Sequence, residues 1–253
     1  MLTSVLSTYI HGTVQWAVLF FCAVLIGMSK TGIQGIGTLV VPILALVFGA
    51  KPSTGLLLPM LCLADLMAVI YYRKNAEWKY ILRIIPTAIA GFGIALIVDR
   101  YIPEKDFKLL IALCIFAGLA VMFWSEKKGN TNNITSSRFY GPFFGILGGF
   151  TTMIGNAAGP IMAVYLLSMR LPKYAFVGTS AWFFMIVNYL KIPVQIFAWD
   201  NITISSVTVN LICIPFIFIG GICGIYLVKK LPEEKYRTMI IILTVLSAGL
   251  LLL

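Results

Sequence analysis

The sequence contains little charge, and acidic residues are especially scarce. Only 11% of the 253 residues are Asp, Glu, Lys or Arg, whereas a typical soluble domain carries about a quarter. Nine Asp and Glu residues stand against 19 Lys and Arg, and 60% of all residues are hydrophobic. This composition excludes a soluble enzyme, a disordered tail and a DNA-binding domain, so we expect no nucleic-acid partner.

The sequence also lacks the patterns of metal, disulfide and nucleotide chemistry. It has a single histidine, His11, and its five cysteines lie in apolar stretches without a Cys-x-x-Cys pair. It contains neither a His-Glu-x-x-His pattern nor a Walker pattern. We therefore expect no metal site, no cofactor, no ATP-driven step and no enzyme activity.

Long apolar runs dominate what is present, and the mean hydropathy is +0.98. The runs cover residues 14–48, 55–72, 81–98, 107–124, 140–168, 175–198, 204–228 and 236–253. About 20 apolar residues suffice to cross the hydrocarbon core of a bilayer. The sequence therefore predicts an all-α polytopic membrane protein whose surroundings are the lipid bilayer. The beginning of the chain has neither cations nor a small-residue cleavage pattern, so we expect no cleaved signal peptide.

Two of the runs, 14–48 and 140–168, are too long for one crossing and are rich in glycine. These glycines are Gly27, Gly32, Gly35 and Gly37 in the first run and Gly145, Gly148, Gly149, Gly155 and Gly159 in the second. Helix breaks at membrane depth are tolerated only where protein or a water-filled cavity surrounds them. We expect broken helices that restart near Gly35–Thr38 and near Gly155–Ala157.

The chain divides into two similar transmembrane halves, residues 1–124 and 140–253, joined by a polar loop at residues 125–139. The segment from Gly91 onward matches the segment from Gly220 onward at a constant offset of 129. Residues 37–42 match residues 155–160 at an offset of 118, which pairs Thr38 with Asn156. Asp65 and Asn188 correspond at an offset of 123. These matches predict two homologous repeats.

The distribution of Lys and Arg indicates that the repeats are inverted. If both glycine-rich runs return to the side from which they came, thirteen cations fall on one side and four on the other; eight single crossings give no such bias. The thirteen are Arg73, Lys74, Lys79, Arg83, Lys127, Lys128, Arg138, Arg170, Lys173, Lys229, Lys230, Lys235 and Arg237, and the four are Lys51, Arg100, Lys105 and Lys108. Cytoplasmic loops carry the excess of cations, so we expect the 125–139 loop in the cytoplasm and both termini outside.

Two lysines, Lys30 and Lys191, lie within apolar runs rather than in loops. An ionisable residue inside a membrane span is costly and usually marks a substrate or ion pathway. Lys191 follows Asn188 by about one helical turn, so the two side chains share a helix face. We expect Lys30, Lys191 and Asn188 to bind substrate. The alternative is that each lysine extends to the membrane interface.

The restarted helices offer a second kind of anion site. The first N–H groups of a helix lack partners within the helix and carry partial positive charge, so they attract anions. We therefore add to the expected substrate-binding residues Gly35, Gly37 and Thr38 in one half and Gly155, Asn156 and Ala157 in the other. The alternative is that these glycines only allow close helix packing.

Three further residues complete the expected site. Asp65 is the acidic residue deep in a span, where it can carry protons, pair with a lysine or cap a broken helix. Thr179 and Ser180 lie near the start of a span, where hydroxyl groups either cap the helix or contact a ligand.

Several segments resemble the TauE/SafE family of membrane anion permeases. The first half contains GMSKTGIQGIGTLVVPIL and KPSTGLLLPMLCLADLMAVIYYRKNAEW, and the second contains VGTSAWFFMIVNYLKIPVQIF with its Asn-x-x-Lys-x-Pro element. The resemblance covers about residues 15–250. It departs at Asn75, where the family often has a turn glycine. The resemblance implies transport of sulfite, sulfoacetate or related organosulfur anions in bacteria or archaea.

The residues and the resemblance together predict a secondary transporter. We expect it to move a small sulfur-containing anion across the plasma membrane of a bacterium or archaeon by alternating access between inverted repeats. An uncoupled anion channel and a membrane accessory or assembly protein without transport are the alternatives. A homodimer is compatible with the sequence.

Overall fold

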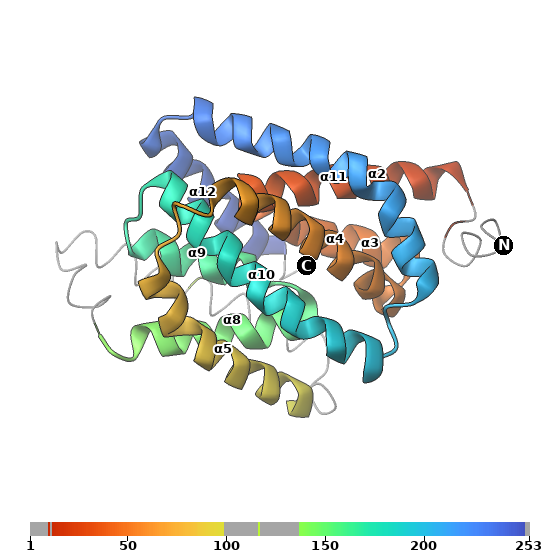
Figure 1. Cartoon of the computed structure of the whole chain (residues 1–253), viewed down its shortest axis with the longest axis horizontal. Helices are drawn as coiled ribbons and strands as arrows, with labels where there is room; N and C mark the ends of the chain where they lie inside the picture. Colours follow the sequence, from red (N-terminus) through yellow and green to blue (C-terminus); the bar gives the residue numbers. More distant parts are fainter. Residues whose placement is uncertain (1–9, 11, 99–115, 117–136, 251–253) are drawn as a thin grey trace.

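The computed structural model describes residues 10, 12–98, 116 and 137–250, and the secondary structure of these residues is entirely helical. The helices are α2 (Thr13–Thr31), α3 (Ile36–Phe48), α4 (Ala50–Tyr72), α5 (Trp78–Val98), α8 (Tyr140–Gly155), α9 (Ala158–Ser168), α10 (Lys173–Phe197), α11 (Ile204–Lys230) and α12 (Glu233–Leu250). Most of them run roughly along the long axis of the molecule (Figure 1). The expected apolar run at 107–124 and nearly all of the 125–139 loop lie outside the described residues.

Five of the described helices are long and apolar enough to cross a membrane. These are Thr13–Thr31, Ser53–Tyr72, Trp78–Ile97, Lys173–Phe197 and Ile204–Lys230. Large apolar side chains such as Phe21, Ile70 and Phe218 are more than half exposed. By contrast, charged and polar side chains such as Asp65 and Lys191 are fully buried. An apolar surface around a partly polar core suits lipid surroundings, and the predicted polytopic all-α class is confirmed.

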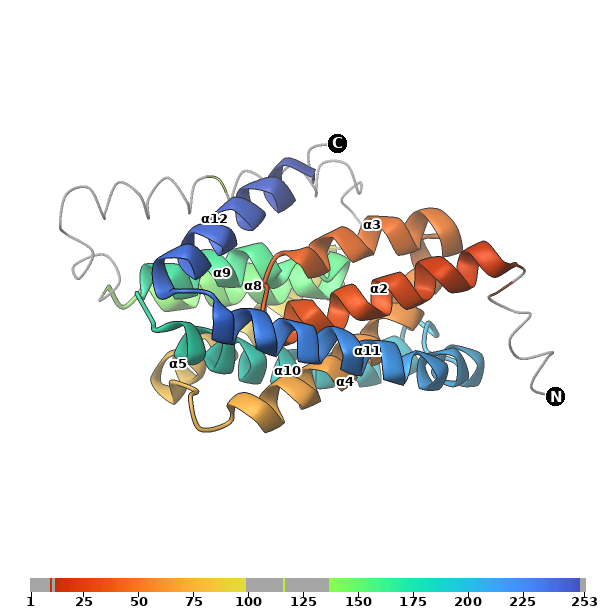
Figure 2. The ribbon, with the colours of Figure 1, turned by 90° about the horizontal axis from the view of Figure 1, so that it is seen from above.

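Both glycine-rich runs form broken helices, as predicted. α2 ends at Thr31 and α3 begins at Ile36, after Gly35 with a φ of 103°. α8 ends at Gly155 and α9 begins at Ala158, after Asn156 in the left-handed conformation. In each case the chain reverses, so that α3 runs back beside α2 and α9 runs back beside α8 (Figure 2).

The returning helix of each hairpin is too short to cross a bilayer by itself. α3 has 13 residues and α9 has 11, which at 1.5 Å per residue are about 20 Å and about 17 Å long. A bilayer core is about 30 Å thick, so neither returning helix crosses it. The hairpins enter from opposite ends of the molecule, and their tips lie in its interior (Figure 2).

The first helix of each hairpin packs closely on a helix from the other half of the chain. A Cβ atom on Gly27 of α2 would lie 2.1 Å from the Ile217 carbonyl oxygen of α11. A Cβ atom on Gly149 of α8 would lie 2.0 Å from the Ala88 carbonyl oxygen of α5. Gly27 and Gly149 are 122 residues apart, and Ala88 and Ile217 are 129 apart. The same contact therefore occurs twice, and glycine allows the two backbones to approach.

The cations predicted for one side gather at one end of the bundle. The α4–α5, α9–α10 and α11–α12 junctions and the start of α8 lie at the left end in Figure 1, whereas the α3–α4 and α10–α11 junctions lie at the right. The left end carries eleven of the thirteen cations; Lys127 and Lys128 lie outside the described residues. Of the four predicted for the other side, Lys51 is in a described helix, near the start of α4. The inverted relation of the repeats and the membrane side that each end faces stay predictions.

Candidate functional site

The tips of the two hairpins meet beside α4 and α10 around a small cavity of about 40 Å³. A water molecule needs about 10–15 Å³ of such space, so the cavity has room for a few waters or a compact oxyanion. Its lining is Ser29, Lys30, Gln34, Gly35, Gly37, Thr38, Val41, Leu57, Leu61, Thr152, Asn156, Gly159, Ser180, Ala181, Phe184 and Asn188. The cavity is therefore built from both halves of the chain.

Lys30 supplies the cation of the cavity wall. It lies in the last turn of α2, immediately before the helix break. Its Nζ atom is 2.9 Å from Oδ1 of Asp65 on α4 and 3.8 Å from the centre of the Phe184 ring on α10. The Lys30 side chain is 10% exposed and that of Asp65 is fully buried. Lys30 thus points into the protein rather than to the membrane interface.

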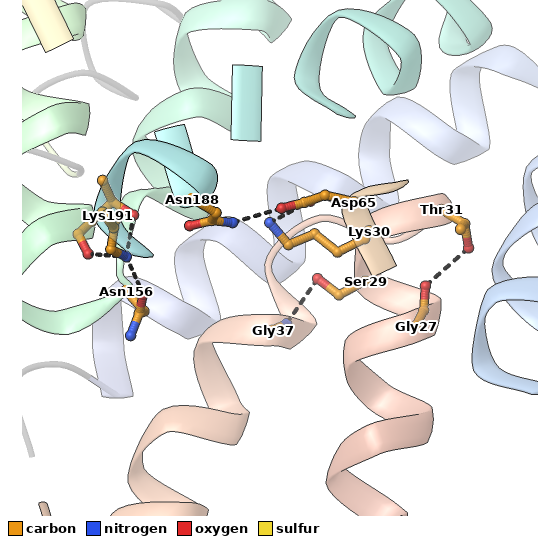
Figure 3. Close-up of polar contacts among 10 residues, drawn as sticks. Gly27, Ser29, Lys30, Thr31, Gly37, Asp65, Asn156, Asn188 and Lys191 are labelled. Carbon is orange, nitrogen blue, oxygen red and sulfur yellow. Dashed lines mark hydrogen bonds and ion pairs between the residues drawn. The ribbon is translucent and has the colours of Figure 1, made fainter. Parts of the chain in front are cut away.

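Asp65 connects Lys30 to α10. Its Oδ2 atom accepts a hydrogen bond of 2.6 Å from Nδ2 of Asn188, while Oδ1 faces Lys30 (Figure 3). Of the three roles left open for Asp65 by the sequence, the structure shows the pairing with a lysine. The pair compensates two charges whose burial would otherwise be costly, and it ties the first hairpin to two core helices.

Lys191 is fully buried and lies behind the cavity wall. Its Nζ atom donates to the Thr152 carbonyl oxygen at 2.7 Å, to the Thr152 hydroxyl at 3.3 Å, and to Oδ1 of Asn156. These acceptors lie at the end of α8, where the helix dipole attracts a cation. Because Oδ1 of Asn156 is held by Lys191, its Nδ2 group is turned away from the lysine (Figure 3). Lys191 is thus a positioning residue for Asn156.

The helix restarts lie at the cavity, but some of their N–H groups already have acceptors. The Gly37 N–H donates to the Ser29 hydroxyl at 3.1 Å, and the Thr38 N–H donates to the Gly35 carbonyl oxygen at 3.1 Å. A Cβ atom on Gly159, in the first turn of α9, would lie 3.8 Å from the Thr38 hydroxyl. The two helix N-termini therefore face one another across the cavity.

Two buried amide oxygens at the cavity have no hydrogen-bond partner within the described chain. They are Oε1 of Gln34 and Oδ1 of Asn188, on side chains that are 4% and 1% exposed. A buried polar atom without a partner costs about 1–3 kcal/mol. An occupant of the cavity with polar groups would remove this cost, by direct contact or through rotation of the amides.

The cavity contains seven of the predicted binding residues. The seven that line it are Lys30, Gly35, Gly37, Thr38, Asn156, Ser180 and Asn188. The four outside its lining are Gly155, Ala157, Thr179 and Lys191. Thr179 instead accepts a hydrogen bond of 2.9 Å from the Glu77 N–H in the α4–α5 loop. Its hydroxyl therefore holds a loop in place.

Sequence reasoning missed four lining residues with polar or aromatic side chains: Ser29, Gln34, Thr152 and Phe184. A signal for Phe184 was present, because Ser180, Phe184 and Asn188 recur every four residues and so share one face of α10. Likewise, Thr152 precedes Asn156 by one helical turn. Spacing from the predicted residues would have found both.

The structure also corrects the alignment of Thr38 with Asn156. Thr38 is the third residue of α3, whereas Asn156 lies in the break before α9. The offset of 122 given by the glycine contacts matches the helix starts, Ile36 and Ala158. It pairs Asn156 with Gln34, and both of these side chains line the cavity.

The comparison with protein families identifies the chain. The model of the sulfite exporter TauE/SafE family matches residues 17–251. The chain belongs to the TauE/SafE family. No curated protein and no solved structure matched it. TauE/SafE membership agrees with the apolar helices in indicating a multi-pass membrane protein of an anion-exporter family, and it is consistent with a protein that is not an enzyme.

Proposed function

We propose that this TauE/SafE protein is a secondary transporter for a small sulfur-containing oxyanion. Sulfite, sulfoacetate and related organosulfonates are the substrate class, and the plasma membrane of a bacterium or archaeon is the location. The observation that carries the proposal is the convergence of two opposed helix breaks on one cavity that contains Lys30. Broken helices that meet near the membrane midplane are the usual substrate site of transporters with repeated halves.

The residues of the cavity supply the groups that an oxyanion needs. Lys30 has one carboxylate partner and an ammonium group with three donors. The Asn156 amide, the Ser180 hydroxyl and the N–H group of Gly159 in the first turn of α9 are further donors at the wall. Lys191 acts through Asn156 and adds a second positive charge behind it. Asp65 contacts Lys30 rather than the anion, and proton carriage by Asp65 stays a proposal.

The positions of the hairpins support alternating access as the mechanism. Each hairpin reaches the cavity from a different end and packs on a helix of the other half through a glycine contact. Movement of one hairpin would open the cavity to one end, and movement of the other hairpin would open it to the opposite end.

Flux measurements test the proposal. The purified full-length protein is placed in liposomes, and uptake of radiolabelled sulfite is measured against concentration, with protein-free liposomes as the control. We expect saturable uptake that unlabelled alkylsulfonates inhibit. Linear uptake without saturation would indicate a channel. Absence of any flux of sulfite, sulfoacetate, taurine or thiosulfate by folded protein would overturn the proposal.

A further inference from the structure

Three charged side chains surround the cavity in the core. Lys30 lines the cavity, Asp65 pairs with Lys30, and Lys191 lies behind Asn156. Among the described residues, Asp65 and Lys191 are the charged side chains that are fully buried. Two cations and one carboxylate leave a sum of one positive charge. The residues that the structure describes therefore leave one positive charge of the site uncompensated.

The hydrogen bonds of Lys191 indicate that it carries its charge. Its Nζ atom has three acceptors, two on Thr152 and one on Asn156. An ammonium group has three N–H donors, whereas a neutral amine has two and an acceptor lone pair. The Thr152 carbonyl oxygen and Oδ1 of Asn156 can only accept, and the C-terminal end of α8, where both lie, attracts a positive charge and so favours the ammonium form.

A single buried positive charge favours one class of ligand. A bound anion with one negative charge brings the sum of the site to zero, whereas an anion with two leaves an uncompensated negative charge. Uncompensated charge is costly where water is excluded. We propose that the cavity selects singly charged sulfur oxyanions, such as bisulfite and alkylsulfonates, over doubly charged ones, and that Asp65 sets this selectivity. The inference rests on the proposed anion transport and narrows its substrate class.

Asp65 is suited to this role because it is fixed outside the cavity wall. Lys30 holds its Oδ1 atom and Asn188 holds its Oδ2 atom, and these partners come from α2 and α10. Asp65 is absent from the lining, although both of its partners belong to it. Its negative charge therefore acts on every occupant of the cavity without occupying the space of the ligand. The doubly charged sulfoacetate is accordingly a poorer substrate than bisulfite.

Competition in proteoliposomes tests the inference. Uptake of radiolabelled sulfite is inhibited with unlabelled methanesulfonate, which has one charge, or with sulfate, which has two; neither ligand titrates near neutral pH. For the wild type we expect sulfate to require at least a tenfold higher concentration than methanesulfonate. In D65N the site gains a charge. If the separation between this charge and the ligand is taken as about 7 Å, with an effective dielectric constant of about 20, the ratio of the two concentrations should fall roughly 50-fold.

Two variants separate charge from damage to the fold. Asp200→Asn makes the same chemical change at an exposed residue of the α10–α11 connection, and it should leave the ratio at its wild-type value. The double variant K191M/D65N returns the sum to one positive charge and keeps Lys30 at the cavity wall, so it should regain the wild-type ratio. If D65N alone does not fold, Lys191→Met supplies the test, because it lowers the sum to zero and should raise the ratio.

The outcomes distinguish the two proposals. Saturable sulfite uptake that sulfate inhibits as well as methanesulfonate would overturn the charge selectivity and leave transport intact. The same conclusion would follow if neither anion competes, or if K191M/D65N behaves like folded D65N. An absence of saturable uptake by the wild type would instead remove the proposed function itself.

Discussion

Replacing Lys191 by methionine tests whether a charge that does not touch the cavity contributes to anion binding. Methionine has a similar length and removes the ammonium group that donates to Thr152 and Asn156. If the separation between the lost unit charge and the anion is taken as about 7 Å, with an effective dielectric constant of about 20, binding weakens by about 2.4 kcal/mol. This corresponds to roughly a 50-fold higher dissociation constant. The maximal uptake rate per folded molecule should change less than the affinity.

The assay is sulfite uptake in proteoliposomes, combined with the sulfite-induced shift in melting temperature of the detergent-solubilised protein. Lys229→Met is the matched control, because Lys229 is exposed near the end of α11. Asn156→Ala keeps the charge of Lys191 but removes one amide donor, so we expect a smaller loss of about 1–1.5 kcal/mol. A folded Lys191→Met protein with sulfite affinity within twofold of the wild type would refute the electrostatic reasoning.

Three further predictions address the fold and the topology. Gly149→Ala should lower the melting temperature markedly, because its Cβ atom would lie 2.0 Å from a backbone oxygen. Gly93→Ala should not, because Gly93 has open space around it. Equal melting temperatures of the two variants would contradict the close contact at Gly149. Thr179→Val should cost about 1 kcal/mol of stability through its lost hydrogen bond and leave sulfite affinity unchanged; a lower affinity would return Thr179 to the site. In a protein without its native cysteines, Asp200→Cys should react with an impermeant thiol reagent from outside, and Lys229→Cys should react only from inside. Labelling of both cysteines from the same side would overturn the predicted topology.

The fold was predictable as far as it depends on local composition. The length of the runs at 14–48 and 140–168, together with their glycines, identified both broken helices, and the restarts were expected within a few residues of Ile36 and Ala158. Helix length is a local property, and a run of 35 residues cannot cross a bilayer once as a straight helix. The short lengths of the returning helices, 13 residues in α3 and 11 in α9, were not predictable, because both runs continue as apolar sequence beyond these helices or up to the next loop.

The lining of the candidate site was predictable in part, and the contacts between its residues were less so. An intramembrane lysine is a strong signal by itself, and Lys30 indeed lies at the cavity. The partners of Lys30 and Lys191 come from other helices, so no spacing in the sequence indicates them. Thr179 and Ser180 illustrate a limit that helix geometry imposes. Adjacent residues on a helix point about 100° apart, so Ser180 reaches the cavity while Thr179 faces the α4–α5 loop.

The error in aligning the two hairpins has a physical cause, because glycine serves two purposes in this protein. Gly27 and Gly149 allow helices to touch, whereas Gly35 adopts a φ of 103° that ends the link between two helices. At the other break Asn156 adopts a left-handed conformation in place of a glycine, as asparagine does more readily than other residues. Matching Gly37 to Gly155 therefore joined the second residue of α3 to the last residue of α8. Matching the backbone contacts instead aligns the two breaks with each other. This alignment pairs the amide residues Gln34 and Asn156, and both of them line the cavity.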